Sequence, residues 1–352
     1  MTTKTRTYRT VKQQDILNKI LVTGIALFIL LIFIAPLGYM FTTGIKSDEQ
    51  MSDPNASPFW PQSSATFEYE GEQLEVYQVP TEDGVRALAA IKKTRTATTF
   101  IDPKNPAAGE IIWEGNWRTL EQAYTSDPQW DNFKRAWDEL NFPRLFRNTL
   151  IIAVTGTFGA VCSSILVAYG FSRFEFRGKN IMFMILVGTI ILPMQATLIP
   201  TYIVFQRIGW VNTFLPLIVP HFFANAYNVF LLRQYFLQVP REMDEAAMID
   251  GAGPFRTLIS VLLPQAWPAI TAVSLFHFFF SWNDFFSPLV YLVSREDLWP
   301  LSVGLQRFNA TYGRVPNLIQ TSALITLVLP VIIFFLAQRV FMQGIVFSGV
   351  EK

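Results

Sequence analysis

Six apolar runs, separated by polar segments, dominate the pattern along the chain. They lie at Ile20–Phe41, Thr149–Phe171, Ile181–Val204, Thr213–Leu232, Trp267–Val290 and Thr321–Phe341. A helix needs about 20 apolar residues to cross the hydrocarbon core of a bilayer. Since each run is close to that length, the pattern predicts an all-α polytopic membrane protein with about six transmembrane helices.

The composition agrees with a chain that lies largely in lipid. Of its 352 residues, 51% are hydrophobic and 16% are charged, whereas a soluble domain usually carries about 25% charged residues. The net charge of +1 gives no basic excess for a nucleic-acid partner. With one cysteine and two histidines, the chain has too few ligands for the usual Cys- or His-based metal sites, so we expect no bound metal.

The distribution of basic residues predicts the orientation, because loops on the cytoplasmic side carry an excess of Lys and Arg. Basic residues exceed acids in the tail before the first run and in the loop after the second run. With six spans, these two segments and the C-terminal end share one side. The sequence therefore predicts an inner (plasma) membrane protein whose N- and C-termini are both cytoplasmic.

This topology divides the chain into five parts. They are a cytoplasmic tail (1–19), a first transmembrane helix (20–45), an external segment (46–147), a core domain with five spans and a short helix at 240–253 (148–344), and a second cytoplasmic tail (345–352). The apolar run at 20–41 is longer than the roughly 7–15 residues of a signal-peptide core. It is therefore interpreted as a retained anchor.

The external segment contains alternating stretches that are typical of strands. Phe67–Tyr69 and Leu74–Val79 flank a turn of hairpin composition, and Ala89–Ile101 and Glu110–Trp113 indicate further strands. Trp130–Leu140 indicates a short amphipathic helix. We expect a small, mainly β external insertion that touches a partner protein; the alternative is a loosely ordered loop.

A polar stretch at 239–253, between the fourth and fifth runs, predicts a short helix. Pro240 suits the first turn, the acids at 242, 244 and 245 suit the positive end of the helix dipole, and Gly251 suits the left-handed residue that ends a helix. Such a helix, held between two spans, is able to dock on a soluble partner as a lever. The alternative is a connecting helix that has no partner.

The same stretch resembles a known signature. Glu245-Ala246-Ala247, three residues, Gly251, nine residues and then Val261-Leu262-Leu263-Pro264 is similar to the EAA signature of ABC importer permeases, with Val261 in place of Ile. Ser281-Trp282-Asn283-Asp284 and Leu198–Tyr202 resemble the maltose and glycerol-phosphate type permeases of the carbohydrate-uptake branch. The resemblance covers about 144–344 and leaves out most of 53–117.

This resemblance implies a type I ABC importer permease fold and a non-catalytic permease subunit, which moves a sugar or related solute delivered by an external binding protein. The implied partners are a second, nonidentical permease chain, two ATPase subunits and the extracytoplasmic solute-binding protein. The residues implied to contact the ATPase are Glu245, Ala246, Ala247, Asp250 and Gly251. The chain lacks a G-x-x-x-x-G-K-[ST] phosphate loop, so ATP and Mg are expected on the partner ATPase and no cofactor on this chain.

Polar residues in or near the spans are the candidates for a substrate path, because groups of this kind are costly in a membrane and often functional. They are Asp284, Asn283, Trp282, His277, Asn225 and Gln195. For each of them the alternative is a structural role, either hydrated at the interface or bonded within the helix bundle.

Two other functions remain as alternatives. An ion-gradient-driven secondary transporter or channel is expected to show inverted repeats or charges near the membrane midplane, and the sequence shows no clear repeat and few charges in its spans. A membrane enzyme or assembly factor would use the external domain, which shows no clustered His and no Ser-His-Asp pattern. The EAA-type signature favours the ABC permease.

Overall fold

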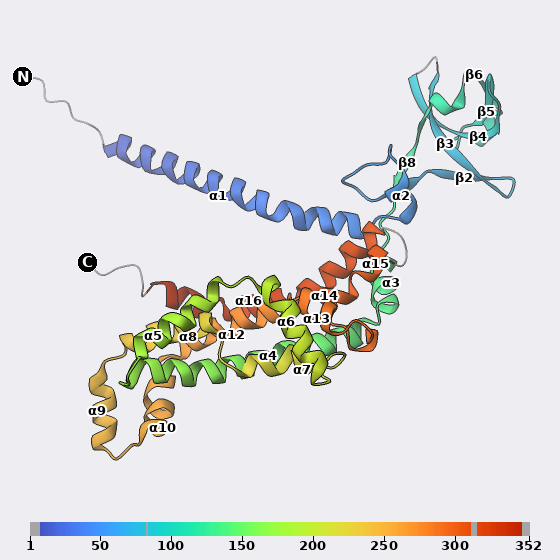
Figure 1. Cartoon of the computed structure of the whole chain (residues 1–352). Helices are drawn as coiled ribbons and strands as arrows, with labels where there is room; N and C mark the ends of the chain where they lie inside the picture. The colour runs from blue at the N-terminus through green and yellow to red at the C-terminus, as the bar shows by residue number, and fades with distance from the viewer. Residues whose placement is uncertain (1–7, 82–83, 311–314, 347–352) are drawn as a thin grey trace, which may run out of the picture. The chain divides into compact units, whose positions relative to one another are not determined.

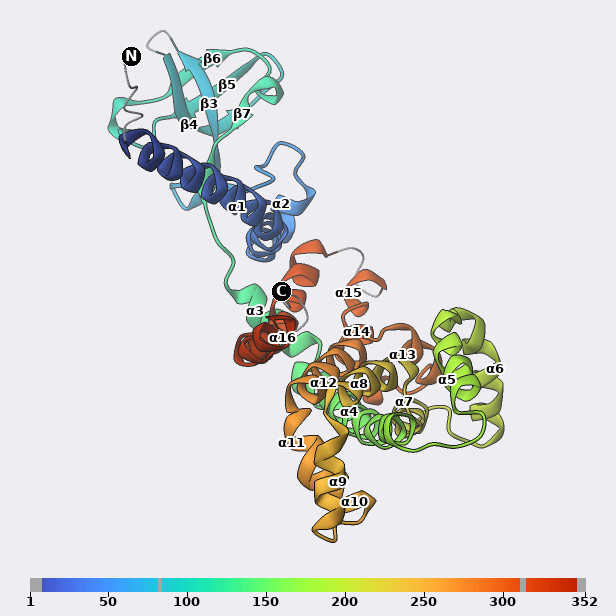
Figure 2. The same cartoon turned by 90° about the vertical axis from the view of Figure 1, so that its left-hand side faces the viewer.

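The computed structural model describes residues 8–81, 84–310 and 315–346, and Figures 1 and 2 show the arrangement of their elements. The chain divides into two compact units. The first comprises Met1–Arg135 and Arg314–Leu324, and the second comprises Ala136–Gly313 and Ile325–Lys352. Helix α16 (Pro316–Val346) contributes to both units.

The first unit begins with α1 (Tyr8–Gly44), a helix of 37 residues that contains the first predicted span. Its stretch Asp15–Gly44 is long and apolar enough to cross a membrane, and no residue of its apolar 18-residue window is buried within the chain. Because intrahelical hydrogen bonds satisfy the backbone, such a helix is stable when lipid surrounds its apolar side chains.

The carboxyl end of α1 is capped by side chains from distant parts of the sequence. Asn132 donates to the carbonyl oxygens of Gly44 and Lys46, at 2.9 and 2.8 Å. Asn317 donates to the Lys46 carbonyl at 3.0 Å, and the hydroxyl of Thr321 donates to the Gly44 carbonyl at 2.8 Å. The last carbonyls of a helix have no partner within it, so these side chains anchor α1 to α3 (Asp131–Glu139) and α16.

A β domain (residues 62–126) forms most of the remainder of the first unit. Its described strands form an antiparallel sheet in the order β2-β3-β4-β5-β6, with β7 also paired to β3, and β1 pairs separately with β8. The bounds are β1 Gln62–Ser64, β2 Thr66–Tyr69, β3 Glu72–Thr81, β4 Gly84–Lys93, β5 Ala97–Ile101, β6 Ile111–Glu114, β7 Glu121–Gln122 and β8 Tyr124–Ser126. The prediction of a small, mainly β insertion is confirmed.

The predicted hairpin lies between β2 and β3. Glu70 and Gly71 both have positive φ, at 52° and 86°. Positive φ at both central residues is required in the two-residue hairpin turn whose twist matches that of the strands. The stretch expected as one strand at 89–101 is instead two strands, β4 and β5, which pair with each other in antiparallel register. The polar residues at 94–96 turn the chain between them, a break that the apolar alternation did not reveal.

Both faces of the sheet carry a buried cluster. Leu74, Val76 and Ile101 belong to one cluster, and Val79 and Phe100 belong to the other. Alternate residues of a strand point to opposite faces, so the odd and even positions of β3 supply different cores. The first unit also contains α2 (Asp48–Ser52), η1 (Pro106–Ala108) and η2 (Trp117–Thr119).

The second unit is built around α4 (Phe142–Arg173), which packs against α8 (Ala226–Gln238) and α12 (Trp267–Trp282). Small residues on α4 allow its neighbours to come close, as is usual between membrane helices. A Cβ at Gly159 would lie 2.5 Å from the Phe222 ring. The shared core includes Ala168, Leu232 and Leu262.

The spans differ in shape from six straight helices. Among the described residues, four stretches are long and apolar enough to cross a membrane: Asp15–Gly44, Phe142–Arg173, Leu215–Gln238 and Pro316–Gln338. Two further pairs are bent, Lys179–Ile191 with Ala196–Arg207 by 100° and Pro254–Gln265 with Trp267–Trp282 by 82°. The total reaches the predicted six when each bent pair counts as one span.

Prolines account for the breaks, because a proline lacks an N–H group and disfavours helical geometry in the residue before it. Pro193 lies at the first bend, Pro216 lies in the first turn of α7, and Pro220 lies in the first turn of η4, where the α-helix changes to a 3-10 turn. The remaining bounds are α5 Lys179–Gly188, η3 Thr189–Ile191, α6 Met194–Arg207, α7 Leu215–Ile218, η4 Val219–Phe222, α13 Phe286–Tyr291, η6 Glu296–Leu298, α14 Leu301–Gly304 and α15 Arg307–Ala310.

Candidate coupling site and translocation path

The segment 240–264, here called the coupling segment, contains the predicted short helix. Helix α9 runs from Arg241 to Ile249, with Pro240 immediately before it. Gly251 has a φ of +80°. Its N–H bonds the carbonyl of Met248 at 3.0 Å, and the N–H of Ala252 bonds the carbonyl of Ala247 at 2.8 Å. These two bonds form a Schellman motif, which favours glycine at the left-handed position.

The residues expected to meet an ATPase lie on the open side of this helix. Glu245, Ala246, Asp250 and Gly251 are exposed, and Ala247 is half-buried. In both Figure 1 and Figure 2, α9 and α10 (Pro254–Thr257) project beyond the ends of α4 and α8. The segment therefore presents a free surface to another molecule.

Exposed apolar side chains continue this surface. Met248 is 58% exposed, Ile249 is 87% exposed and Phe255 is 67% exposed. Met248 and Ile249 lie on the short polar helix α9, where lipid does not explain their exposure, and Phe255 lies at the start of the bent pair that begins at Pro254. Exposed apolar patches are typical of protein interaction sites.

One residue of α9 faces inward and anchors the helix. The carboxylate of Asp244 lies 2.6 Å from the guanidinium of Arg173 at the end of α4, and both side chains are nearly buried. Arg173 also donates to the Val239 carbonyl at 3.0 Å. Burial raises the pKa of Asp244, and the charge of Arg173 opposes this effect. The ion pair fixes α9 to the longest helix of the second unit.

Two tyrosine hydroxyls hold the rest of the segment. Tyr169 of α4 donates to the Pro254 carbonyl at 2.9 Å, and Tyr235 of α8 donates to the Gln265 carbonyl at 2.9 Å. Between these points the chain forms a π-helical turn, η5 (Leu258–Leu262), and then α11 (Leu263–Gln265). A π turn within a helix often accompanies a functional site, and here it precedes the 82° bend into α12.

This anchoring was not predicted from the sequence. Arg173 is one of the basic residues that follow the second apolar run, and Asp244 is one of the acids that suit the helix dipole. Neither residue has a local signal for pairing, because α5 to α8 separate them along the chain. Only the packing of α9 beside the end of α4 brings the two charges together.

Three polar side chains form a hydrogen-bonded series in the interior of the second unit. The Asn228 amide lies 3.2 Å from Nδ1 of His277, and Nε2 of His277 lies 3.1 Å from Nδ1 of His221. With the amide nitrogen of Asn228 donating, Nδ1 of His277 accepts and its Nε2 donates to His221. His277 and Asn228 are buried, and their hydrogen bonds join α8, α12 and η4.

Two cavities open beside His221. One, of about 180 Å³, is lined by Asp284, Thr201, Ser287 and Tyr291 among others. The second, of about 480 Å³, is lined by residues that include Asn225 and Phe280. Such a combination of apolar walls with a few polar groups is typical of small-molecule sites.

The predicted path residues fall into three groups. His277, Asp284 and Asn225 lie in or beside the polar interior. Trp282 is buried against Phe278 and Phe146, and Asn283 is exposed and donates to the carbonyl of Phe279. Gln195 lies outside the residues whose side chains the structure describes.

Two of these candidates, Asp284 and Asn225, also have structural roles. A carboxylate oxygen of Asp284 accepts from the N–H of Ser287 at 3.2 Å, at the start of α13. The side chain of Asn225 accepts from the N–H of Asn228 at 3.1 Å and caps α8. Asn228, Thr201 and Tyr291 were not predicted as part of this region, because isolated polar residues in an apolar run give no indication of which ones meet.

Comparison with known proteins assigns a family to the part of the chain that holds the coupling segment and the two cavities. The family described as "Binding-protein-dependent transport system inner membrane component" matches residues 159–346, which include the whole coupling segment and both cavities. The chain belongs to this family. It is therefore an ABC importer permease of the inner membrane, and the alternative of an ion-gradient-driven transporter is set aside.

Individual relatives cover more of the permease. An osmoprotective compounds uptake permease protein of Synechocystis is 32% identical over 282 residues, which is 78% of this chain and 93% of that protein. A trehalose/maltose transport system permease protein of Thermococcus litoralis is 30% identical, over 61% of this chain and 78% of the relative. An alpha-glucoside transport system permease protein of Rhizobium meliloti is 29% identical, over 63% of this chain and 60% of the relative.

A solved structure shows the same fold. The permease resembles a chain of a bacterial ABC transporter involved in the import of the acidic polysaccharide alginate, with a TM-score of 0.63 and 19% identity. The match covers 95% of the permease and 98% of that chain. The predicted type I ABC importer permease fold, with a small β-rich insertion, is thus confirmed.

Proposed function

We propose that this permease imports a sugar or a related hydroxylated solute, using ATP hydrolysed by a separate subunit. Relatives named for trehalose/maltose, alpha-glucoside and sn-glycerol-3-phosphate transport support this solute class. The polar cavities beside His221 agree with it, because they offer hydrogen-bonding side chains between apolar walls. The chain itself contributes the path and the coupling surface, and the chemistry of ATP belongs to its partner.

The observation that carries the proposal is the geometry of the coupling segment. Its outer face is open, whereas its inner face is tied to α4 by Asp244 and Arg173. A force applied to the exposed residues Glu245, Ala246 and Asp250 would reach the spans through this ion pair. Such a helix acts as a lever only when it is free on one side and fixed on the other.

The assembly that we propose has a second, nonidentical permease chain, two ATPase subunits and an external solute-binding protein. In this arrangement both termini and the coupling segment lie in the cytoplasm and the β domain lies outside. ATP and Mg bind the ATPase subunits. The solute passes the polar residues His277, Asp284 and Asn225, which line or support the cavities.

The experiment is uptake of a radiolabelled sugar by cells or proteoliposomes that contain the complete transporter. Glu245→Lys reverses a charge on the docking face, and Gly251→Pro is incompatible with a φ of +80°. We expect both variants to insert in the membrane and both to lose uptake. Glu72→Lys, an equally exposed glutamate in the β domain, is the control and should transport normally.

Co-purification of the ATPase separates docking from folding. We expect the Glu245→Lys permease to reach the membrane at the normal level but to retain less ATPase. If both variants import at the rate of the unaltered permease, the coupling segment does not transmit force and the proposal is wrong.

A further inference from the structure

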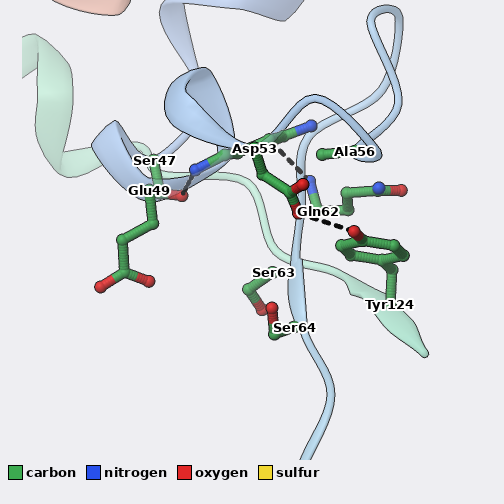
Figure 3. Close-up of a pocket in the computed structure, with 9 residues that line it drawn as sticks. Ser47, Glu49, Asp53, Ala56, Gln62, Ser63, Ser64 and Tyr124 are labelled. Carbon is green, nitrogen blue, oxygen red and sulfur yellow. Dashed lines mark hydrogen bonds between the residues drawn. The ribbon is translucent and has the colours of Figure 1, made fainter. Parts of the chain in front are cut away.

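The first unit contains a polar hollow that neither coupling nor the path through the spans uses. It has a volume of about 150 Å³ and is shown in Figure 3. Its lining is polar apart from Ala56, and comprises Ser47, Glu49, Gln50, Asp53, Gln62, Ser63, Ser64 and Tyr124. A cavity needs roughly 10–15 Å³ of probe-occupied space to hold one water, so this polar hollow has room for several waters or for a group of the size of a sugar ring.

Hydrogen bonds hold the wall of the polar hollow in place. The Tyr124 hydroxyl donates to one oxygen of Asp53 at 2.6 Å, and the other oxygen accepts from the N–H of Asn55 at 2.9 Å. The side-chain oxygen of Gln50 accepts from the N–H of Gln62 at 2.9 Å. Burial and the neighbouring Asp53 raise the pKa of Tyr124 to about 12, so its hydroxyl keeps its proton and the bond to Asp53 at neutral pH.

Other polar groups of the lining are not engaged. The Glu49 carboxylate, the Gln62 side-chain amide and the Ser64 hydroxyl form no hydrogen bond with another described residue. Figure 3 shows the Glu49 side chain free of any dashed contact. Together these groups offer three kinds of acceptor, the carboxylate, amide and hydroxyl oxygens, and two kinds of donor, the amide and hydroxyl groups. This mixture is able to bind hydroxyl groups.

A wider hollow adjoins the first through Tyr124, which lines both. It measures about 680 Å³ and is lined by two further aromatic residues, Tyr77 and Trp117, together with Asn55, Arg118, Glu121 and Gln122 among others. This volume lies in the range of roughly 300–1,000 Å³ that small-molecule sites occupy. Tyr77 is 5% exposed and Lys93 lies over its ring, so the aromatic contact area comes from the half-buried Trp117 and Tyr124. Aromatic rings supply apolar area with a polar edge, which suits the alternating C–H and O–H surfaces of a sugar.

The charge of the lining narrows the class of ligand. The polar hollow has two carboxylates, Glu49 and Asp53, and neither Lys nor Arg in its lining. The hydroxyl groups of a neutral polyol are able to donate hydrogen bonds to these carboxylates, whereas an acidic sugar would place like charges together. The lining of the polar hollow therefore favours an uncharged sugar ring over a uronate, and the wider hollow carries one charge of each sign, Arg118 and Glu121.

We propose that the two hollows around Tyr124 form a carbohydrate-binding subsite on the β-domain side of the permease, which takes an uncharged oligosaccharide. One ring fits the polar hollow beside Asp53 and Glu49, and a second lies against the aromatic wall of the wider hollow. The subsite rests on the proposed function, in that the solute is a sugar and the β domain faces the side from which it arrives. It would hold the solute outside the spans before or during transfer.

The test is saturation-transfer NMR on the full-length permease in nanodiscs, with trehalose, sucrose and maltotriose as probes and an alginate trisaccharide as the anionic comparison. The variants are Glu49→Gln, Asp53→Asn and Tyr124→Phe. Glu68→Gln and Tyr69→Phe make the same chemical changes on β2, outside both hollows. Loss of a hydrogen bond to a charged group should weaken binding by roughly tenfold.

We expect at least one neutral probe to bind, the three subsite variants to bind it roughly tenfold more weakly, and the controls to be unchanged. The subsite is refuted if no neutral probe binds, if the controls lose binding equally, or if the alginate trisaccharide binds as tightly as the neutral probes. It is also refuted if the variants impair only capture of a binding protein, since the acidic wall would then receive a basic side chain.

Uptake by the complete transporter is measured separately, so that the two proposals are distinguishable. ATP-driven sugar uptake by the unaltered transporter tests the proposed function, whatever NMR shows for the β domain. Normal uptake without any binding that depends on Tyr124, Asp53 or Glu49 would leave the permease a sugar importer and would remove the subsite.

Discussion

Asp244 differs from the other acids of α9 in pointing toward the protein. It and Arg173 are nearly buried and lie 2.6 Å apart, and the second carboxylate oxygen of Asp244 finds no hydrogen-bond partner among the described residues. Breaking a buried ion pair by removing one partner typically costs about 3–5 kcal/mol, whereas replacing both partners by apolar residues is often neutral. The pair therefore positions α9 at the end of α4.

Asp244→Asn should loosen the coupling segment and lower transport, because the charge of Arg173 then stays buried without a counter-charge. We expect faster amide hydrogen exchange at 240–264 and a loss of stability of about 3 kcal/mol. The double variant Arg173→Met with Asp244→Leu should recover much of that stability. Asp250→Asn, an exposed acid after the same helix, is the control; equal effects at both positions would contradict a positioning role for Asp244.

Glu75 makes the β domain sensitive to acid. Hydrogen bonds from Lys93 and from the Tyr77 hydroxyl hold the pKa of Glu75 below its usual value of 4.5. A carboxyl whose pKa is lower in the folded than in the unfolded state contributes stability above the unfolded value. This contribution is lost as the pH falls from about 4.5 through the lower folded-state pKa.

The corresponding prediction is a pH-dependent exchange experiment on the full chain. Amide protection in β3 and β4, corrected for intrinsic exchange, should fall as the pH drops below about 4.5. In Glu75→Gln, protection should be lower at neutral pH and this acid-dependent component should disappear. Glu72→Gln, an exposed glutamate of the same strand, should behave as the unaltered chain does; identical profiles for all three would refute the role of Glu75.

At the scale of the helix, α1 depends on side chains from far along the sequence. Asn317 and Thr321 lie one turn apart on α16 and both bond carbonyls at the end of α1. Gly44 allows this contact, because a Cβ there would lie 2.9 Å from the Thr321 hydroxyl oxygen. Residues four apart share one face of a helix, so a single face of α16 receives the end of α1.

Asn317→Ala should weaken this attachment. It removes one donor to the Lys46 carbonyl and one to the Asp48 carboxylate. Asn132 and Arg135 still bond these two groups, so the expected cost is the net value of the lost hydrogen bonds, about 1–2 kcal/mol. We expect a lower midpoint of thermal unfolding for the purified chain and faster exchange at 40–50. Asn309→Ala removes an exposed asparagine and serves as the control; an unchanged midpoint for Asn317→Ala would show that α1 is held by other contacts.

Hydropathy predicted where the spans lie but not where they bend. Each predicted span lies on a helix or helix pair of the structure, but the 100° bend between α5 and α6 was not predicted. Pro193 was visible in the sequence, and prolines are tolerated in spans whenever neighbouring groups satisfy the backbone. The bend is thus decided by how the surrounding helices pack, which a run of apolar residues does not reveal.

At the scale of the whole molecule, the proposed orientation places the β domain outside and the coupling segment inside. The chain offers a direct test, because Cys162 is its only cysteine. In a Cys162→Ala background, Arg95→Cys adds a thiol in the turn between β4 and β5, and Ile249→Cys adds one at an exposed position of α9.

With a membrane-impermeant maleimide on intact spheroplasts, we expect Arg95→Cys to react at once and Ile249→Cys to react only after permeabilisation. The charge bias of the loops requires this result. The opposite labelling pattern would invert the topology and would place the coupling segment where no cytoplasmic ATPase could reach it.

The sequence alone determined that the chain is a helical membrane protein, and it predicted about six spans and the short helix that the structure has at Arg241–Ile249. These properties depend on local patterns: apolar length, basic loops, and a proline, acids and glycine in the order that starts and ends a helix. The hairpin at Glu70-Gly71 belongs here too, because its turn residues are adjacent.

Only the tertiary structure decided which polar residues meet. The pair Arg173 and Asp244, the series Asn228, His277 and His221, and the hollows around Tyr124 each join segments that are distant in sequence. The residues next to a carboxylate or an imidazole in the sequence do not indicate which distant group will bond it. In surroundings of low polarity an unpaired polar group is especially costly, so the identity of the partner has a large effect on stability. Packing of the helices and strands supplied that information.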